Sequence, residues 1–521
     1  MRTIGTGWRL SFAGVVAVGA ALAIGELLAG ILPDVPSALL AVARFIVDIQ
    51  PPGAKELVVA LFGEADKVAF QVFIVIVALA LGAWLGRIAP KHPDIAGGVI
   101  ALFAAAGFVA SIREPAASPV LSAVVAGGQA IAGMWILNRL IPIALRGAAR
   151  SEPAAPARRG MPDWSRRSLL RTGGAIAIGS VVAGAAGRYL LERQRAPISP
   201  GGVPVAARPA DLPSGADIAT ADLTTEGFTP IVVPNADFYR IDTAFIPPTV
   251  DRDAWSLKVH GLVDREVTLT YEELTALPII EQFVTIACVS NEVGGNLVGN
   301  ARWTGVKLRD VLSMAGVQSS ADQLVGRSVD GFTAGMPVEW VMDPAREPMI
   351  AVGMNGEPLP RNHGYPARLI IPGLYGYVSA TKWLSELELT RFDLFEGFWI
   401  PRGWSAMAPI LTQSRIDVPR FGQTVRAGRV PVAGVAWAPD RGIQRVEVKI
   451  GEADWAPATL SAPISKATWV QWRYDWQATP GTYRLEVRAV DGAGEVQTDA
   501  RSNPAPDGAR GHHGYNVTVQ A

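Results

Sequence analysis

The sequence predicts a multidomain protein with an α-helical membrane domain, an α+β domain and a C-terminal β-sandwich of immunoglobulin-like type. Three observations lead to this prediction. Most of the excess hydrophobicity lies before residue 192, short strand and helix patterns alternate in the middle of the chain, and the C-terminal part shows the period-two alternation of half-buried strands. The predicted domains are residues 1–192, 217–405 and 406–521, joined by a Pro-, Gly- and Ala-rich linker at 193–216.

The membrane domain is predicted from five apolar segments, each near the length of about 20 residues that crosses a bilayer as a helix. They are residues 10–32, 68–88, 95–112, 120–141 and 172–191. A shorter amphipathic piece at 38–49 favours a helix at the membrane surface rather than a span. Polar side chains inside spans are functional candidates by default. Here they are Glu26, Gln129 and Gln71, and proton or quinone handling is one role they could have.

The basic residues predict the orientation of these spans. Arginines and lysines gather before the first span, between the second and third, and between the fourth and fifth, whereas the other connections balance them with acids. Because cytoplasmic loops carry excess positive charge, the N-terminus is predicted to be cytoplasmic and everything after residue 191 extracytoplasmic, in a multi-pass protein of the cell membrane. Residues 165–171, Ser-Arg-Arg-Ser-Leu-Leu-Arg, fit either a twin-arginine export motif or a simple positive flank.

Charge and histidine content argue against two classes of function. The formal net charge is +0, which does not suggest a nucleic-acid partner. The spans contain no histidine, because His92 lies in a connection, and the sequence has no C-x-x-C-H motif. No haem is therefore expected.

The α+β domain holds the only cysteine of the chain, Cys288. It ends an apolar run at 283–287, which predicts a strand, and it opens a polar, glycine-rich loop. A strand end fixes a thiol while a loop leaves room for a ligand, and thiolates are soft metal ligands. One thiolate does not hold a metal alone, so a metal here must bring most of its own ligands. The alternative is a buried cysteine that acts as a small hydrophobe.

The residues around Cys288 resemble those of the sulfite oxidase family of molybdenum enzymes. The loop reads C-x-S-N-x-x-G-G and is followed by N-A-R-W-T-G-V-x-L-x-D-V-L at 300–312. The resemblance covers residues 217–521 and implies a sulfite-oxidase-type molybdopterin domain at 217–405, with molybdenum-molybdopterin as the cofactor. It also implies that Cys288 binds molybdenum through its sulfur, while a pterin dithiolene supplies two more sulfurs.

The resemblance implies several residues that hold the pterin or line the pocket. In the stretch 233–242 it assigns pterin contacts to Asn235, Phe238 and Tyr239 and a place in an anion pocket to Arg240. The family's following Asn-His pair is replaced by Ile241-Asp242, which departs from a sulfite-type pocket.

A second marker, residues 354–373, presents His363 and Arg368 five positions apart at the start of an apolar run. An arginine fork suits phosphate oxygens, and the resemblance implies that both residues hold the phosphate end of the pterin. The following segment, one residue longer than the family's spacing, implies further contacts from Ser379, Thr381 and Lys382. Ser328 matches a hydroxyl that reaches the pterin, and Arg302 matches an arginine near the mouth of the active site.

The C-terminal domain resembles the family's dimerisation domain. The resemblance implies a homodimer as one assembly, with packing inside a single chain as the alternative. Four tryptophans of this domain are predicted to lie in its core: Trp455, Trp469, Trp472 and Trp476.

Together these features predict a membrane-anchored molybdenum oxidoreductase with an extracytoplasmic site. The predicted reaction moves an oxygen atom between the metal and a small sulfur-containing or anionic substrate, with two electrons per turnover. The predicted catalytic residues are Cys288, Tyr239, Arg240 and Arg302, with Tyr239 as the donor of a hydrogen bond or proton. Electrons would pass to or from a separate quinone or cytochrome. The alternatives are a sulfoxide-type reductase, a catalytically silent binding module, and a membrane part that works as a transporter.

Overall fold

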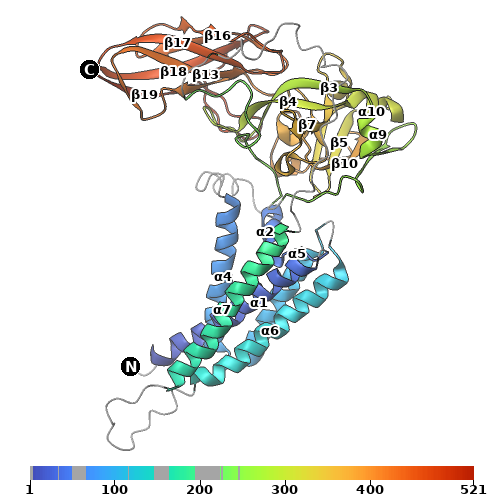
Figure 1. Ribbon diagram of the computed structural model, residues 1–521, viewed down its shortest axis with the longest axis vertical. Coiled ribbons are helices and arrows are strands. Elements are labelled where there is room, and N and C mark those ends of the chain that lie inside the picture. Colours follow the sequence, from blue (N-terminus) through green and yellow to red (C-terminus); the bar gives the residue numbers. More distant parts are fainter. Residues whose placement is uncertain are drawn as a thin grey trace, which may run out of the picture. The chain divides into compact units, whose positions relative to one another are not determined.

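The computed structural model describes residues 4–32, 34–49, 66–114, 117–145, 164–193, 223, 227–244 and 247–521. The chain divides into two compact units, residues 1–196 and 197–521 (Figure 1). The predicted linker at 193–216 lies, beyond its first residue, outside the described residues. In the twin-arginine-like motif, the side chains of Ser165 and Arg166 also lie outside them.

In the described parts of the first unit, five helices are long and apolar enough to cross a membrane: Gly7–Ile31, Lys67–Ile88, Pro93–Ser111, Pro119–Leu145 and Arg167–Leu191. They belong to α1 (Ile4–Ile31), α4 (Asp66–Ile88), α5 (Pro93–Ser111), α6 (Pro119–Leu145) and α7 (Trp164–Arg193). Each coincides with one of the predicted apolar segments. The amphipathic piece forms the shorter helix α2 (Ala38–Ile49), and its place at a membrane surface stays a prediction.

Helix α1 packs against α4 and α7 through glycines. A Cβ atom on Gly14 would lie 1.8 Å from the carbonyl oxygen of Gly82, and one on Gly30 would lie 2.5 Å from that of Gly187. Glycines at such crossings let two helix backbones approach closely, as is common between membrane helices. Helices α1 and α7 run side by side in Figure 1.

The polar residues expected in the spans are paired. The Glu26 carboxylate accepts a hydrogen bond from Ser37 and lies 3.5 Å from Nη1 of Arg188. Arg188 also donates to the side-chain oxygen of Gln71, and Gln129 donates to a backbone carbonyl of α1 at 3.1 Å. Because apolar surroundings strengthen each such contact, these pairs tie α1 to α6 and α7, and α7 to α4.

The α+β domain is built on two sheets within residues 247–521. One has the strand order β2-β1-β10-β5-β6, and the other has the order β3-β4-β7-β8 with β9 paired to β7. The first contains β1 (Ser256–Gly261), β2 (Val267–Thr270), β5 (Gln323–Ser328), β6 (Thr333–Pro337) and β10 (Leu384–Thr390). The second contains β3 (Ile279–Ala287), β4 (Val298–Lys307), β7 (Met349–Met354), β8 (Glu357–Pro358) and β9 (Arg368–Ile370).

Short helices connect these strands: α9 (Tyr271–Thr275), α10 (Leu308–Ala315), α11 (Val338–Met342), α12 (Gly376–Ser379) and the 3-10 turns η2 (Arg361–His363) and η3 (Ile400–Arg402). Helix α9 begins with a capping box. The Glu273 amide donates to the Thr270 hydroxyl at 3.2 Å, and the Thr270 amide donates to the Glu273 carboxylate at 2.8 Å. Such reciprocal bonds satisfy amides that the first helical turn leaves free.

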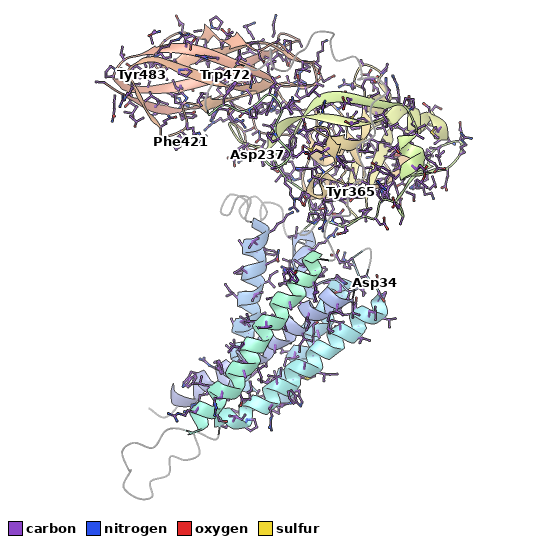
Figure 2. The ribbon with its side chains drawn as sticks, in the orientation of Figure 1. Asp34, Asp237, Tyr365, Phe421, Trp472 and Tyr483 are labelled. Carbon is purple, nitrogen blue, oxygen red and sulfur yellow. The ribbon has the colours of Figure 1, made fainter. Side chains whose placement is uncertain are left out.

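The C-terminal domain is a sandwich of two sheets, again within residues 247–521. The first sheet has the order β11-β13-β17-β16 and the second β12-β19-β18-β14-β15. The strands are β11 (Gln413–Val418), β12 (Thr424–Arg426), β13 (Gly428–Trp437), β14 (Ile443–Ile450), β15 (Ala456–Pro457), β16 (Thr459–Leu460), β17 (Val470–Ala478), β18 (Gly481–Asp491) and β19 (His513–Gln520). Side chains from both sheets form one apolar core, to which Trp472 belongs (Figure 2).

The tryptophans of this domain are mainly core residues, as the sequence predicts. Trp469, Trp472 and Trp476 are buried, whereas Trp455 is half-buried and lies under the Arg488 guanidinium. Trp469 joins the two domains, because its ring nitrogen donates to the Ile231 carbonyl at 2.8 Å and it packs in the core of the α+β domain. The sandwich is therefore in direct contact with the sheet that carries Cys288.

Candidate active site

Cys288 follows the last residue of β3, and the loop 288–297 returns the chain to β4. The Cys288 amide donates to the Leu297 carbonyl at 2.9 Å, and the Asn291 amide donates to the Cys288 carbonyl at 3.1 Å. The Asn291 side chain accepts the Leu297 amide at 2.8 Å. Cys288 is a free, buried cysteine. The loop backbone is thus closed on itself and holds the thiol at the strand end, as the sequence predicts.

The two glycines of the loop, Gly294 and Gly295, meet different structural requirements. Gly294 has a φ of +81°, in the left-handed region that favours glycine. Gly295 has no such φ, but a Cβ atom there would lie 2.5 Å from Oδ1 of Asn291. A side chain at Gly295 would therefore break the Asn291–Leu297 contact that closes the loop.

An aromatic wall lies beside the β3–β4 hairpin. The Phe238 ring stacks on Tyr239 at 5.3 Å between centroids and meets Trp303 edge-on at 6.0 Å. Gly299 of β4 makes room for it, because a Cβ atom there would lie 2.7 Å from the Phe238 ring. Gly299 and Trp303 share one face of β4, since side chains alternate along a strand. The predicted pair Phe238 and Tyr239 is thereby brought to this face.

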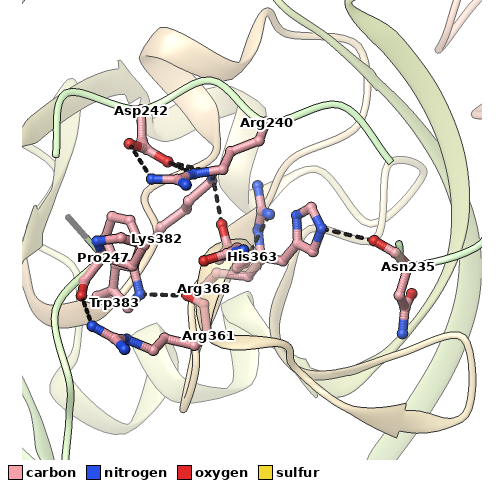
Figure 3. Close-up of polar contacts among 10 residues, drawn as sticks. Asn235, Arg240, Asp242, Pro247, Arg361, His363, Arg368, Lys382 and Trp383 are labelled. Carbon is pink, nitrogen blue, oxygen red and sulfur yellow. Dashed lines mark hydrogen bonds and ion pairs between the residues drawn. The ribbon is translucent and has the colours of Figure 1, made fainter. Parts of the chain in front are cut away.

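His363 and Arg368 lie against the same wall. The His363 ring is edge-on to Phe238 at 5.7 Å, and its Nε2 lies 3.1 Å from the Asn235 carbonyl. Nη1 of Arg368 donates to the His363 carbonyl at 2.9 Å, and its guanidinium carbon lies 5.0 Å from the centroid of Trp303. Arg368 is 2% exposed, yet its Nε has no hydrogen-bond partner within the described part of the chain. Figure 3 shows His363 and Arg368 together with Asn235.

A cluster of cations surrounds one carboxylate next to these residues (Figure 3). Asp242 accepts from Nε of Arg240 at 2.9 Å and from Nζ of Lys382 at 3.2 Å. Lys382 also donates to the Asn362 carbonyl at 3.0 Å, and Arg361 donates to the Pro248 carbonyl at 3.2 Å. Asp242 is the one carboxylate among the residues labelled in Figure 3, all of them in the described part of the chain, whereas four of them are cations: Arg240, Arg361, Arg368 and Lys382. The cluster therefore carries excess positive charge.

Burial shifts the pKa values of this cluster in the direction that disfavours charge. Burial, with Lys382 and Arg368 adding to it, lowers the pKa of His363 to about 4. Burial also lowers the pKa of Lys382 to about 8, although Asp242 opposes the change, and it lowers the pKa of Arg368 to about 10. A bound anion would relieve all three shifts, because it favours the charged forms.

Tyr239 lies within electrostatic range of both the thiol and the cations. Burial raises its pKa well above its usual value of 10; Cys288 adds to the rise and Arg368 opposes it. The phenol therefore keeps its proton at neutral pH and can donate it to a hydrogen bond. Burial raises the pKa of Tyr375 in the same way, with a smaller contribution from Cys288.

Four residues proposed from the resemblance have other contacts. The Arg302 side chain is on the face of β4 opposite Gly299 and Trp303, where it lies 3.9 Å from Glu281. The structure does not bring it to the cluster. The hydroxyls of the other three make backbone contacts: Ser328 accepts the Asp330 amide, Ser379 donates to the carbonyls of residues 374 and 375, and Thr381 donates to the Gly326 carbonyl. Their roles toward a ligand stay predictions.

Four other residues of the site were not assigned from the sequence: Asp242, Trp303, Arg361 and Tyr375. Trp303 and Arg361 lie inside the motifs at 300–312 and 354–373, so their position in the motif was an available signal. Asp242 was noticed only as a departure from the family. Its pairing with Lys382 joins positions 140 residues apart in sequence, and no local pattern signals such a contact.

Three comparisons relate the chain to known proteins. The family described as "Oxidoreductase molybdopterin binding domain" matches residues 244–399. Mitochondrial sulfite oxidase of Homo sapiens is 29% identical over 326 residues, which cover 53% of this chain and 59% of that protein. The uncharacterized oxidoreductase YuiH of Bacillus subtilis (strain 168) is 34% identical over 167 residues, which cover 32% of this chain and 80% of that protein. Sulfane dehydrogenase SoxCD from Paracoccus pantotrophus aligns with 61% of this chain and 94% of that chain at 23% identity, with a TM-score of 0.49.

The donor set fits the group that this family binds. The unpartnered Nε of Arg368 and the cationic excess suit a phosphate, and the buried thiol of Cys288 suits a soft metal. Among the described residues, no group of three or more His, Cys, Asp or Glu side chains is arranged to hold a metal ion. A metal bound at Cys288 would therefore have to take most of its ligands from a cofactor.

The match to a molybdopterin-binding domain, in a domain that contains a buried thiol and a cluster of cations, defines a molybdopterin-dependent oxidoreductase. The chain belongs to the sulfite oxidase family of these enzymes.

Proposed function

We propose that the protein is a membrane-anchored oxidoreductase that uses molybdenum-molybdopterin to transfer an oxygen atom to or from a small sulfur-containing or anionic substrate. The observation that carries this proposal is that the buried thiol of Cys288 and the guanidinium of Arg368, whose buried Nε is unpartnered within the described chain, both act electrostatically on Tyr239. The curated relatives named sulfite oxidase support a sulfur substrate.

The residues that would hold the cofactor divide into two ends. Cys288 would bind the metal. His363, Arg368 and Lys382 would bind the phosphate, and Asn235 and Phe238 would contact the pterin between them. Ser328, Ser379 and Thr381 would contribute through the backbone around them, because their hydroxyls bond to the protein itself. When bound, the cofactor would supply the two-electron chemistry that no amino-acid side chain provides.

The chain's own residues would bind and orient the substrate. Tyr239 would hold its proton at the phenol oxygen and donate a hydrogen bond to a substrate oxygen. Phe238 and Trp303 exclude water along one side, which strengthens that bond. Arg240 would attract an anion, but its ion pair with Asp242 at 2.9 Å offsets much of its charge. This balance favours a substrate of low charge and keeps a sulfoxide-type reductase as the alternative.

Membrane anchoring and sidedness belong to the same proposal. The five apolar helices among the described residues support a multi-pass anchor, and the distribution of basic residues supports an extracytoplasmic catalytic domain. The electron partner would be a separate quinone or cytochrome, since no haem is expected in this chain. A homodimer through the C-terminal domain, and the immunoglobulin-like nature of that domain, stay predictions.

Metal and pterin analysis of the detergent-purified protein, wild type beside Cys288→Ser, tests the proposal. The expected result is near-stoichiometric molybdenum with a fluorescent pterin, and loss of the metal's thiolate signature in the variant. Turnover would then be assayed with sulfite and an electron acceptor, and with a sulfoxide and an electron donor. Absence of molybdenum from protein made in a host that synthesises the cofactor would contradict the proposal that this protein is a molybdenum enzyme. A loaded protein without turnover of either substrate would favour the silent binding module.

A further inference from the structure

The tip of the Cys288 loop is bonded to the C-terminal sandwich. Arg415 of β11 donates through Nη1 to the Gly295 carbonyl at 2.8 Å, across a sequence separation of 120 residues. Its Nε donates to the Asp417 carboxylate at 2.6 Å, and its Nη2 donates to the Thr229 hydroxyl at 2.9 Å. Arg415 is 8% exposed. All three nitrogens of this buried guanidinium thus donate hydrogen bonds, and one of these bonds goes to the Cys288 loop.

His513 of β19 touches the same loop one residue earlier. A Cβ atom on Gly294 would lie 2.1 Å from Cδ2 of His513, so the ring occupies the space where a side chain would be. The orientation of the ring is fixed by a hydrogen bond, because its Nδ1 accepts the Ile416 amide at 3.0 Å. Since Ile416 follows Arg415 in β11, the two contacts on the loop are rigidly connected to each other.

Contacts within the loop connect its tip, which Arg415 and His513 hold, to the backbone of Cys288. Gly295 packs on the Asn291 side chain, which holds the Leu297 amide, and the Leu297 carbonyl in turn accepts the Cys288 amide. Only these short hydrogen-bonded steps separate the contacts of the sandwich from the backbone of Cys288. A shift of the loop tip therefore moves Cys288, because each step has little freedom.

We propose that Arg415 and His513 are positioning residues, by which the C-terminal sandwich sets the place of the Cys288 thiol. The inference rests on the proposed function, in which Cys288 binds the metal, and it gives the sandwich a part in the active site. A merely structural domain contact would not need a buried arginine aimed at a loop carbonyl. An apolar contact of the same size would join the domains without the cost of burying a charge.

The single cysteine gives a direct test that does not require the cofactor. The full chain is made without cofactor, in a host that cannot synthesise molybdopterin, and is kept in detergent. Iodoacetamide then alkylates Cys288, and intact mass spectrometry follows the rate. We expect Arg415→Ala to speed alkylation about tenfold, because the loop tip loses a charge-assisted hydrogen bond. Arg415→Lys keeps the charge without the fork and should give a rate between the two.

Two control variants separate positioning from general loosening of the sandwich. Val446→Ala removes buried volume from the sandwich core and none of its described contacts reaches the loop. It should lower the unfolding midpoint and leave the alkylation rate within about twofold of wild type, because its cavity lies elsewhere. Arg429→Ala removes an exposed arginine that pairs with Asp475. It should change neither the unfolding midpoint nor the alkylation rate.

Gly294→Ala is the second route to the same question if Arg415→Ala does not fold. Its methyl group would meet His513 and push the loop tip away, so alkylation should again be faster. An unchanged rate in the folded Arg415→Ala or Gly294→Ala protein overturns the proposal. Equal acceleration by Val446→Ala at a matched unfolding midpoint also overturns it. Molybdenum content of the wild type decides the proposed function separately, because alkylation is measured without metal.

Discussion

Arg368 is a buried guanidinium that the described residues satisfy only in part. One nitrogen donates to the His363 carbonyl and the charge faces the Trp303 ring, yet Nε has no partner in the described chain. A buried donor without a partner costs about 1–3 kcal/mol. The fold therefore carries a cost at Arg368 that a bound phosphate would offset, and ligand binding explains the residue better than folding does.

Arg368→Met tests this explanation from both sides. In the cofactor-free chain the unfolding midpoint should stay the same or rise, because an apolar side chain replaces a buried charge. In protein made with cofactor, pterin and molybdenum per chain should fall about tenfold or more, since charge-assisted hydrogen bonds to the phosphate are lost. The exposed Arg445, which pairs with Glu447, provides the control Arg445→Met. A cofactor-free midpoint that falls sharply would assign Arg368 to the fold instead.

Tyr239→Phe separates the phenol from the ring at the same site. The ring should keep its stacking on Phe238, so cofactor content and the unfolding midpoint should match wild type. Turnover should fall about 100-fold, because a positioned proton donor contributes about that much. Steady-state kinetics on the loaded enzyme measure it. Turnover equal to wild type would show that Tyr239 only packs.

At the scale of helices and strands, the sequence predicts those features whose interacting residues lie close together in the chain. The change from strand to loop at Cys288 is local and is found where it was expected. The capping box at Thr270 and Glu273 depends on residues that are equally close in the chain. The apolar segments of the first unit likewise coincide with helices. In each case, one stretch of chain contains all the partners that decide the structure.

Contacts between distant elements could not be predicted in this way. The side of β4 on which Arg302 lies follows from the register of β3 and β4 and from the packing of Phe238 on Gly299, neither of which is visible in one strand. The pairing of Asp242 with Lys382 and the reach of Arg415 to Gly295 also join remote positions. Such contacts require the folded arrangement of several strands.

Gly299→Ala tests whether β4 positions the aromatic wall. The added methyl group would lie 2.7 Å from the Phe238 ring, so the ring or the strand must move. Overpacking of this kind costs about 1–3 kcal/mol, and cofactor content should fall along with the free energy of unfolding. Gly376→Ala is the matched control, because its methyl group would meet nothing closer than 3.6 Å. Equal stability of the two variants would contradict the argument.

At the scale of the whole molecule, one buried histidine, His363, and one half-buried histidine, His513, make the second unit sensitive to acid. Burial lowers the pKa of both His363 and His513 to about 4, with neighbouring cations adding to each shift. Histidine in an unfolded chain titrates near pH 6.5, so the unfolded state takes up protons first as the pH falls. The stabilisation is therefore complete above about pH 6.5 and is lost as the pH falls toward 4, by up to about 3 kcal/mol for each histidine.

Unfolding midpoints of the cofactor-free chain between about pH 7.5 and pH 4.5 measure this dependence. His513→Gln should reduce the slope, because one of the two titrating groups is removed. Cofactor binding should reduce the contribution of His363 to this pH dependence, since a phosphate beside it favours the protonated ring. A midpoint that does not change over this range would contradict the assignment of both histidines.

The proposed orientation of the first unit in a membrane is testable because the chain has a single cysteine to remove. In a Cys288→Ser background, Asp34→Cys and Lys91→Cys place new thiols at two exposed positions, one between α1 and α2 and the other between α4 and α5. The excess of basic residues predicts that the first connection lies outside the cell and the second inside. An impermeant maleimide added to intact cells should therefore label position 34 and not position 91, and permeabilised cells should label at both. The reverse pattern would place everything after residue 191 in the cytoplasm. The catalytic unit would then meet its substrate and electron partner there, with no need to cross the membrane after folding around its cofactor.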